Sequence, residues 1–418
     1  MRILYGEWGS VCDPDMKAAF TGLGHEVVSF PVYCKDYNHE EKFEQEAAGL
    51  FLHGEMVFTF NYFPVISKVC ERGNIPYVCW VYDSPHLTLY SKTVRNSCNH
   101  IFLFDHGLYD ARKREVPEAA WYYLPLSPHV EIPGKDGVPE TPETREGDVG
   151  KMQHEVSFVG SLYTENNFYD QIGYLPEYVE GYFKGVMEAQ LRIYGLYFMR
   201  QSLTGEVCRK FQECAKFDLG KEYEAGADRI VADVFLSRKL ASTERQRLLL
   251  AAAKAADVSL FTGSPAESLV NEFEKDRRGN KALAAQSNPG NLRVFPKVDY
   301  QREMPLIFRT SRINLNLSLR TIETGIPLRV LDILGAGGFL LSNYQAELSE
   351  YFKEGEEFAC FADEKELQEK ISYYLSHEEE RRRIAENGQR KVLALFSYKR
   401  QVERLMDCVT ADLSEATL

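Results

Sequence analysis

The 418-residue sequence lacks the features that define several common classes of protein. Its nine cysteines are scattered with no CxxC pair, so we expect neither a disulfide framework nor a structural zinc site. No apolar run approaches the roughly 20 residues of a membrane-spanning helix. The start MRILYGEW enters an apolar strand pattern without the charged leader of a signal peptide. We therefore expect a cytoplasmic protein.

The sequence also has fewer basic than acidic residues. The 49 Lys and Arg residues face 62 Asp and Glu residues, which gives a formal net charge of −13. Such a chain repels nucleic acid and anionic membranes, so we expect neither as a partner. An anionic ligand would have to be bound locally, by a few basic side chains and backbone N–H groups.

What the sequence does contain is a regular alternation of strand and helix patterns. In the first third, the expected strands cover residues 3–5, 25–30, 56–60, 76–82 and 100–104. This alternation predicts a parallel sheet with helices on both faces. Residues 130–152 are rich in Pro, Gly and charge and have no apolar periodicity, which is typical of a linker.

The alternation resumes after that linker, so we predict two domains, at residues 1–129 and 153–395. Within the second, the strand signal disappears between about residues 164 and 247, which predicts a helical insertion. Its aromatic residues could form an acceptor-binding wall, although a stripe of aromatics at helical spacing more often forms a core. Residues 396–418 are amphipathic and are expected to form a final helix.

The most informative stretch is residues 312–343, RINLNLSLRTIETGIPLRVLDILGAGGFLLSN. Alternating apolar residues predict a strand, Pro327 suits the first position of a helix, and a glycine turn leads to a second apolar strand. In such a unit, the positive end of the helix faces the preceding loop 320–326, which makes that loop a natural anion site.

Three side chains of this unit are candidates for binding a diphosphate and its nucleoside. Arg320 and Arg329 could contact phosphate, and Asp332, which shares a helix face with Arg329, could accept hydrogen bonds from ribose hydroxyls. The alternative is an ordinary ion pair between positions i and i+3 on a solvated face.

Here the chain resembles a known family. GIPLRVLDILGAGGFLLSNYQAELSEYF, followed by FACFADEKELQEKI and ERRRIAENGQRKV, is similar to the C-terminal half of the CgeB-like glycosyltransferases, known as the spore maturation protein type. The resemblance covers roughly residues 300–406. It implies the α/β GT-B architecture, in which two doubly wound Rossmann-like domains face each other across a cleft, and a final helix that returns to the first domain.

The resemblance also implies an activity. Members transfer a sugar from a nucleoside-diphosphate sugar, a UDP-sugar in the first place, to a protein, glycan or cell-surface acceptor, with no cofactor and no required metal. Many retaining GT-B enzymes carry two glutamates eight positions apart on this unit. In this chain Thr324 and Asp332 stand at those positions, with Glu323 adjacent.

Polar residues at other strand ends complete the predicted site. Asp83 and His86 follow the apolar run YVCWVY, and WVYDSPH also resembles the family's N-terminal pattern. His106, with Asp105, follows IFLF. We interpret Asp83, His86 and His106 as candidate catalytic bases, with helix or turn capping as the alternative reading of the aspartates.

Three further residues are candidates for contact with the donor, and two more are assigned to capping. The turn at Gly160 and Ser161 would open the donor domain, as it does in the resembled family. Tyr300 could stack on the base, or it could be a tyrosine of a surface turn. Asp13 and Asp15 form a D-x-D string at a predicted helix start, where we expect capping, and we predict no metal site.

Three other functions fit parts of this pattern. A nucleotide-sugar epimerase could use the same fold. A catalytically silent sugar-binding or spore-surface structural protein would also be compatible. A two-domain periplasmic-type binding protein is disfavoured by the missing signal peptide.

Overall fold

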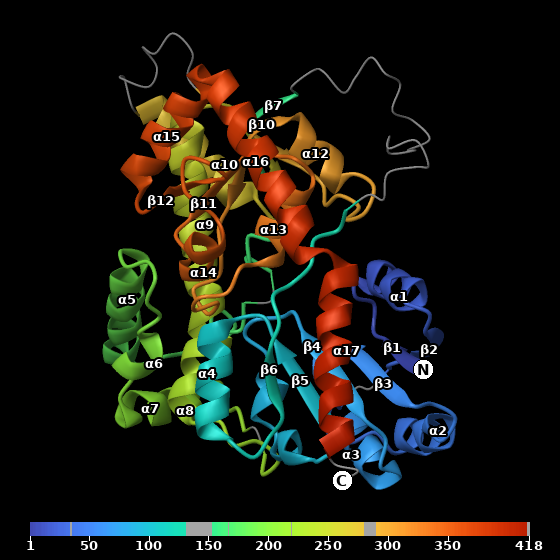
Figure 1. Ribbon diagram of the computed structural model, residues 1–418. Coiled ribbons are helices and arrows are strands. Elements are labelled where there is room, and N and C mark those ends of the chain that lie inside the picture. The colour runs from blue at the N-terminus through green and yellow to red at the C-terminus, as the bar shows by residue number, and fades with distance from the viewer. Residues whose placement is uncertain (34–35, 131–152, 166, 219, 280–289, 416–418) are drawn as a thin grey trace.

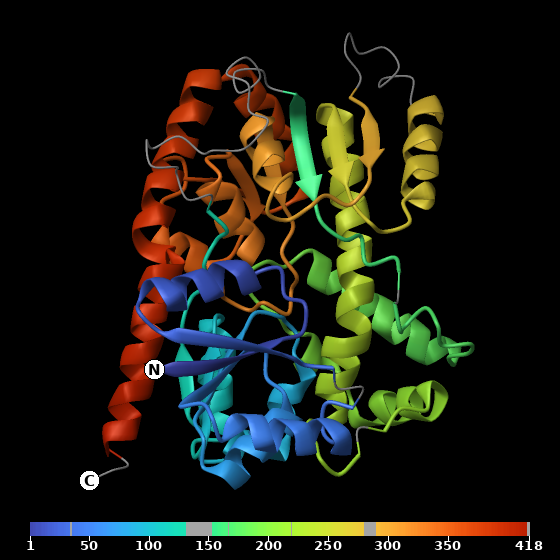
Figure 2. The same ribbon diagram turned by 90° about the vertical axis from the view of Figure 1, so that its right-hand side faces the viewer.

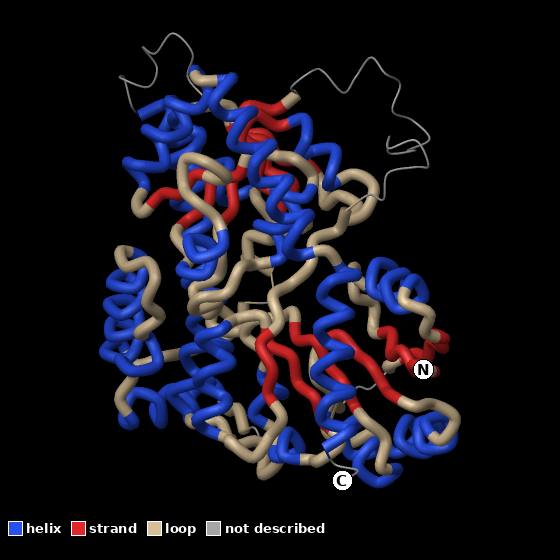
Figure 3. The backbone as a smooth tube through the Cα atoms, in the orientation of Figure 1, coloured by secondary structure: helices blue, strands red, loops and turns tan. Residues whose placement is uncertain are grey.

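The computed structural model describes residues 1–33, 36–130, 153–165, 167–218, 220–279 and 290–415. It contains two six-stranded sheets, with strand orders β2-β1-β3-β4-β5-β6 and β12-β11-β10-β7-β8-β9. Strands are parallel in both sheets, and helices lie on their faces (Figures 1 and 3). The predicted α/β fold with two Rossmann-like units is therefore confirmed.

The first sheet is built from the N-terminal third of the chain. Its strands are β1 (Arg2–Glu7), β2 (Glu26–Pro31), β3 (Met56–Phe60), β4 (Tyr77–Val81), β5 (Asn99–Leu103) and β6 (Trp121–Tyr123). Its helices are α1 (Asp13–Gly22), α2 (Glu41–Phe51), α3 (Pro64–Gly73) and α4 (His106–Glu115), with 3₁₀ turns at Leu87–Tyr90 and Lys92–Arg95. Every residue of β3, β4 and β5 is buried, as expected for inner strands covered on both faces.

The start of α1 differs from the sequence prediction. The N-cap residue is Cys12, and it makes no side-chain capping bond. Asp13 instead accepts a hydrogen bond from the Tyr5 hydroxyl at 2.9 Å, and Asp15 pairs with His129 at 2.9 Å. The expectation that one of these aspartates caps the helix is therefore wrong, because tertiary partners engage both carboxylates.

The second sheet collects strands from the rest of the chain. They are β7 (His154–Val159), β8 (Val258–Phe261), β9 (Leu292–Phe295), β10 (Ser311–Asn316), β11 (Leu340–Asn343) and β12 (Ala359–Phe361). The accompanying helices are α10 (Glu267–Gly279), α12 (Met304–Thr310), α13 (Leu328–Gly335), α14 (Ala346–Tyr351), α15 (Glu364–Ser376) and α16 (Glu378–Phe396). The strand–loop–helix–strand unit expected at residues 312–343 is thus present as β10, α13 and β11.

The polar side of β10 is not solvated. Asn314 and Asn316 are buried, and Asn314 accepts a hydrogen bond from Ser157 on β7 at 2.8 Å while donating to the Phe308 carbonyl at 3.0 Å. Buried amide side chains keep their hydrogen bonds because leaving one unpaired would cost free energy. They therefore tie β10 to its neighbours inside the sheet.

A helical segment separates β7 from β8. It comprises α5 (Glu177–Leu191), α6 (Met199–Ser202), α7 (Gly205–Ala215), α8 (Ala227–Ile230), a π-helix (Val231–Leu236) and α9 (Ser237–Ala255). Arg229 of α8 forms an ion pair with Glu115 at the end of α4, and the long α9 runs up to the second sheet (Figures 1 and 2). Phe183 and Phe211 are fully buried in this segment's own apolar core. These aromatic residues therefore form a core, as the more common alternative had it.

The last helix, α17 (Tyr398–Glu415), lies against the first domain (Figure 1). Tyr82 donates a hydrogen bond to the Tyr398 hydroxyl at 3.3 Å, and Asp412 lies 3.3 Å from His100. The predicted linker, apart from Val130, lies outside the described residues. Within the described part of the chain, no helix is both long enough and apolar enough to span a bilayer.

Candidate functional site

The N-terminus of α13 opens toward the loop that precedes it. Pro327 is the N-cap residue, so the N–H groups of Leu328 and Arg329 begin the helix without intrahelical acceptors. These N–H groups and the helix dipole favour an anion at this point. The local sequence produces this geometry because Pro327 stops the loop from continuing as helix in the N-terminal direction.

Two arginines are candidates for binding an anion together with this helix start. Arg329 is 30% exposed and has Nη1 3.5 Å from Asp332 Oδ2. Arg245, on α9, donates hydrogen bonds to the Ser161 and Leu317 carbonyls and lies over the Tyr163 ring. Burial is the main reason that the pKa of Arg245 is lowered, and the positive charge of Arg329 lowers it further.

Arg245 was not among the residues predicted from the sequence. Its guanidinium group lies between the ends of β7 and β10, where it donates to backbone carbonyls. No carboxylate within the described residues forms a salt bridge with it. Its position in the run TERQRLLL looks like ordinary helix-surface charge, so only the packing of α9 against the second sheet reveals it.

The predicted Gly160–Ser161 turn follows β7. The Ser161 hydroxyl donates to Glu165 at 2.8 Å and accepts from the Tyr163 N–H at 2.8 Å. Ser264, at the end of β8, accepts from the Leu162 N–H at 2.8 Å. The Ser161 side chain therefore stabilises the turn. Its carbonyl oxygen accepts the hydrogen bond from Arg245.

Arg320 does not have the environment predicted for a phosphate ligand. Its guanidinium group forms a buried, bidentate ion pair with Glu244, at 2.6 and 3.1 Å, and stacks on Tyr194 with 3.5 Å to the ring centroid. Both side chains of the pair are 6% exposed. The charge that suggested phosphate binding is thus neutralised within the protein, so we correct the role of Arg320 to a structural one.

Asp332 and Tyr300 form a buried pair. The Tyr300 hydroxyl donates to Asp332 Oδ1 at 2.9 Å, and the His129 N–H donates to the same oxygen at 3.2 Å. Asp332 is 2% exposed, and burial raises its pKa to about 6. The sequence prediction placed Asp332 against ribose and Tyr300 against a base, and both side chains are instead engaged with each other.

The three candidate bases differ in exposure and in their hydrogen-bond partners. Asp83 is exposed and accepts a hydrogen bond from Asn61 at 2.7 Å. His86 Nε2 lies 3.2 Å from the Tyr62 backbone nitrogen and 3.3 Å from its carbonyl oxygen, and burial lowers the His86 pKa. His106 is half exposed at the start of α4, with Nδ1 3.3 Å from Asp110. Asp83 and His106 are therefore accessible, whereas His86 supports the Tyr62 backbone.

Asp105 brings the first domain into contact with the donor loop, residues 320–326. Its carboxylate caps α4 by accepting from the Gly107 N–H at 3.1 Å. It also accepts from the backbone N–H groups of Glu323, Thr324 and Gly325, at 2.7, 3.1 and 3.3 Å. The capping alternative given for this residue is correct, and the same group ties the donor loop to β5 and α4.

Glu347 makes a second link between the two halves. Its carboxylate accepts from the His106 N–H at 2.8 Å, from the Tyr123 hydroxyl at 2.6 Å and from the Thr324 hydroxyl at 2.6 Å. Burial raises the pKa of this carboxyl. His106 therefore sits directly beside the donor loop.

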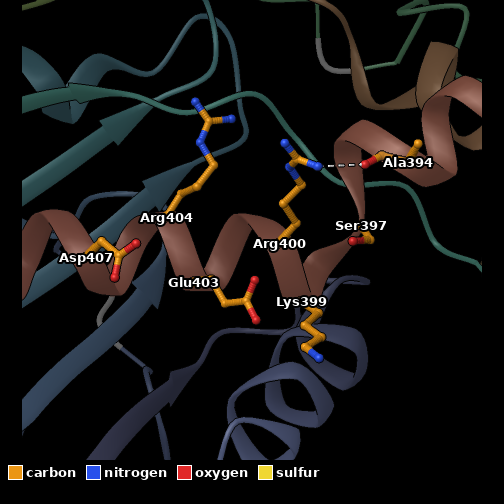
Figure 4. A pocket seen from close by; sticks show the side chains of 7 residues that line it. All are labelled: Ala394, Ser397, Lys399, Arg400, Glu403, Arg404 and Asp407. Carbon is orange, nitrogen blue, oxygen red and sulfur yellow. Dashed lines mark hydrogen bonds between the residues drawn. The ribbon is translucent and has the colours of Figure 1, made fainter.

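A separate hollow of about 680 Å³ lies over the first half of α17. Arg400 and Arg404 project from one side of the helix there, and Lys399 and Glu403 from another (Figure 4). The hollow is lined by Ala394, Ser397, Lys399, Arg400, Glu403, Arg404 and Asp407. None of the predicted donor or catalytic residues lines it, so it is not the candidate site.

No group of three or more His, Cys, Asp or Glu side chains is arranged to hold a metal ion among the residues that the structure describes. The charged groups at the candidate site are thus the two arginines and the flanking carboxylates. Their chemistry suits binding of an anion by guanidinium and N–H groups, with proton transfer by a nearby carboxylate or imidazole.

Known proteins share part of the sequence and the fold of this chain. Residues 244–407 match the model of a family described as glycosyl transferase-like. No curated protein is similar in sequence to the chain.

Several solved structures share the fold at low identity. Anabaena HepE in complex with UDP and glucose matches with a TM-score of 0.52 and 9% identity, covering 98% of this chain and 100% of HepE. A glycosyltransferase from Rickettsia africae matches with a TM-score of 0.54 and 10% identity, over 99% and 98% of the two chains. The sucrose-phosphate synthase of Thermosynechococcus elongatus matches with 0.52 and 11%, over both full chains. The architecture is therefore that of the GT-B glycosyltransferases.

Proposed function

We propose that this GT-B glycosyltransferase takes its sugar from a nucleoside-diphosphate sugar, in the first place a UDP-sugar, bound at the N-terminus of α13. HepE, one of the structures that share the fold, was solved with UDP and glucose. That choice of nucleotide is the reason to test UDP-sugars first.

One observation carries the proposal: Arg245 lies between the ends of β7 and β10 with no salt bridge to a carboxylate of the described chain, and the positive charge of Arg329, at the start of α13, lowers its pKa. Because Asp332 lies 3.5 Å from Arg329, it is mainly the charge of Arg245 that an anion would compensate, together with the positive end of the α13 dipole. A departing nucleoside diphosphate carries the negative charge that such a site stabilises. These groups need no metal ion, and we infer that neither a metal nor a cofactor is required.

On the side of the first domain, Asp83 and His106 are the accessible groups that could accept the acceptor's proton. We infer that residues 1–129 form the acceptor-side domain and residues 153–395 the donor domain. The acceptor itself, whether protein, glycan or cell-surface component, is not specified by these groups. Because the C-terminal motifs resemble those of the CgeB-like glycosyltransferases, we also propose that the chain is of this subtype.

The test is incubation of the purified protein with a panel of UDP-, GDP-, dTDP- and ADP-sugars, followed by chromatographic analysis. Release of nucleoside diphosphate, by transfer or by slow hydrolysis, supports the proposal. Conversion of one nucleotide sugar into its isomer would support the epimerase alternative. Binding without turnover for every donor would favour a catalytically silent sugar-binding protein.

A further inference from the structure

An arginine of α6 links the helical segment between β7 and β8 to the donor loop. Arg200 Nη1 donates to Glu323 Oε1 at 2.6 Å. On the other side of the same guanidinium group, Nε lies 2.8 and 2.9 Å from the two carboxylate oxygens of Asp233. Arg200 therefore bridges a carboxylate of the helical segment and a carboxylate of the donor loop.

The position of Arg200 is fixed from several sides. Asp233 is 3% exposed and lies in the π-helix Val231–Leu236. The guanidinium group also lies over the Tyr197 ring, 5.1 Å from its centroid. An arginine held by a buried carboxylate and an aromatic face points its remaining N–H groups in one direction, and that direction is toward Glu323. π-Helical turns of this kind are frequent at functional sites.

A second bridge holds the other end of the donor loop. Arg320, its first residue, pairs with Glu244 on α9 and donates to the Ile193 carbonyl at 3.1 Å. Both ends of the stretch from Arg320 to Glu323 are therefore tied to the helical segment by charged hydrogen bonds. Such bonds are stronger and more directional than neutral ones.

Glu323 lies where the helical segment, the donor loop and the first domain meet. Its backbone N–H donates to Asp105, and its Cβ is 3.2 Å from the place that a Cβ on Gly107 would occupy. Its side chain is 28% exposed. Arg200 contacts Oε1, and within the described residues no hydrogen bond to the other carboxylate oxygen, Oε2, is formed.

We propose that the helical segment is a positioning element for the donor loop, and that Arg200 is a positioning residue that directs the Glu323 carboxylate toward the hydroxyl groups of the donor sugar. This inference rests on the proposed function. Arg200 acts on the sugar end of the donor, whereas the nucleotide end is held by Arg245, Arg329 and the start of α13. Loss of Arg200 should therefore reduce turnover and leave the affinity for UDP nearly unchanged.

The first experiment compares kcat with UDP affinity in R200A, R200K and the control R247A. Arg247 lies on α9 and pairs with Glu188, and it forms no hydrogen bond with the donor loop among the described residues. R200A should lower kcat on the order of 10²-fold, the scale of a misplaced catalytic group. R200K should restore part of the loss, and R247A should behave as wild type. A loss of UDP affinity in R200A as large as its loss of kcat would overturn the proposal.

The second experiment does not depend on activity. The N–H groups of Glu323, Thr324 and Gly325 are protected by Asp105, so hydrogen–deuterium exchange of the peptide that contains them reports on the order of the loop. R200A should exchange faster there than wild type and R247A, at a temperature where all three are folded. If wild type turned over no nucleotide sugar, the proposed function would fail while this measurement still decided the positioning role. Unchanged exchange in R200A would refute that role.

Discussion

The Thr324 hydroxyl oxygen lies 2.9 Å from the Asp105 carboxylate, although 219 positions separate the two residues in the chain. Three backbone N–H groups of the donor loop converge on the same carboxylate. The loop that precedes α13 is therefore held by the first domain as well as by its own.

Replacement of Asp105 tests this link. D105A would leave several buried N–H groups without an acceptor, so it should lower the free energy of unfolding by about 2–4 kcal/mol. The measurement is urea denaturation, with D110A as control because Asp110 is an exposed residue of the same helix. D105N, which keeps one acceptor oxygen, should fall in between. Equal stability of D105A and D110A would contradict the link.

The proposed donor site is tested by R329A. Removal of this guanidinium group should weaken UDP binding by about 1.5–3 kcal/mol, the scale of a charge-assisted hydrogen bond. Titration calorimetry measures the affinity directly. R390A, at an exposed position of α16, removes the same charge without changing the site and should bind as wild type. Unaltered affinity in R329A would place the nucleotide elsewhere.

The buried Asp332 predicts a dependence of stability on pH. Its folded-state pKa is raised to about 6 from 3.8, so the folded protein binds the proton more tightly than the unfolded chain. Stability should then fall as pH rises through the window from about 4 to about 6. D332N has no proton to lose there, so its stability relative to wild type should increase across this window. Denaturation curves from pH 4 to 7 provide the comparison, and parallel curves for the two proteins would exclude Asp332 as the cause.

Asp83 and His86, three positions apart in the sequence, should behave differently when mutated. D83N removes an exposed carboxylate and should lower turnover by about 10²–10⁴-fold if Asp83 is the base, with nucleotide affinity nearly intact. H86A removes the acceptor of the Tyr62 N–H and should lower the melting temperature instead. Steady-state kinetics and calorimetry separate the two effects. Normal turnover in folded D83N would pass the role to His106, which H106A tests in the same way.

How much could the sequence predict? Alternating and continuous apolar runs gave both Rossmann-like units, because strands and helices impose their own periods on buried residues. The β10–α13–β11 unit and its helix start could be located for the same reason: Pro327 and the glycine turn act locally. The family resemblance, carried by the motifs from residue 300 onward, indicated the glycosyltransferase activity.

The partners of charged side chains were decided only by the tertiary structure. Arg320 pairs with Glu244, which lies 76 positions away in the chain, and Asp332 accepts hydrogen bonds from Tyr300 and His129. The expected contacts of Arg320 with phosphate and of Asp332 with ribose are therefore replaced by contacts within the protein. Arg245, which the sequence analysis did not select, lies between the ends of β7 and β10. A charge in a sequence shows what a residue can bind, but burial and the nearest opposite charge determine what it does bind. Both depend on how distant segments pack, which no local pattern encodes.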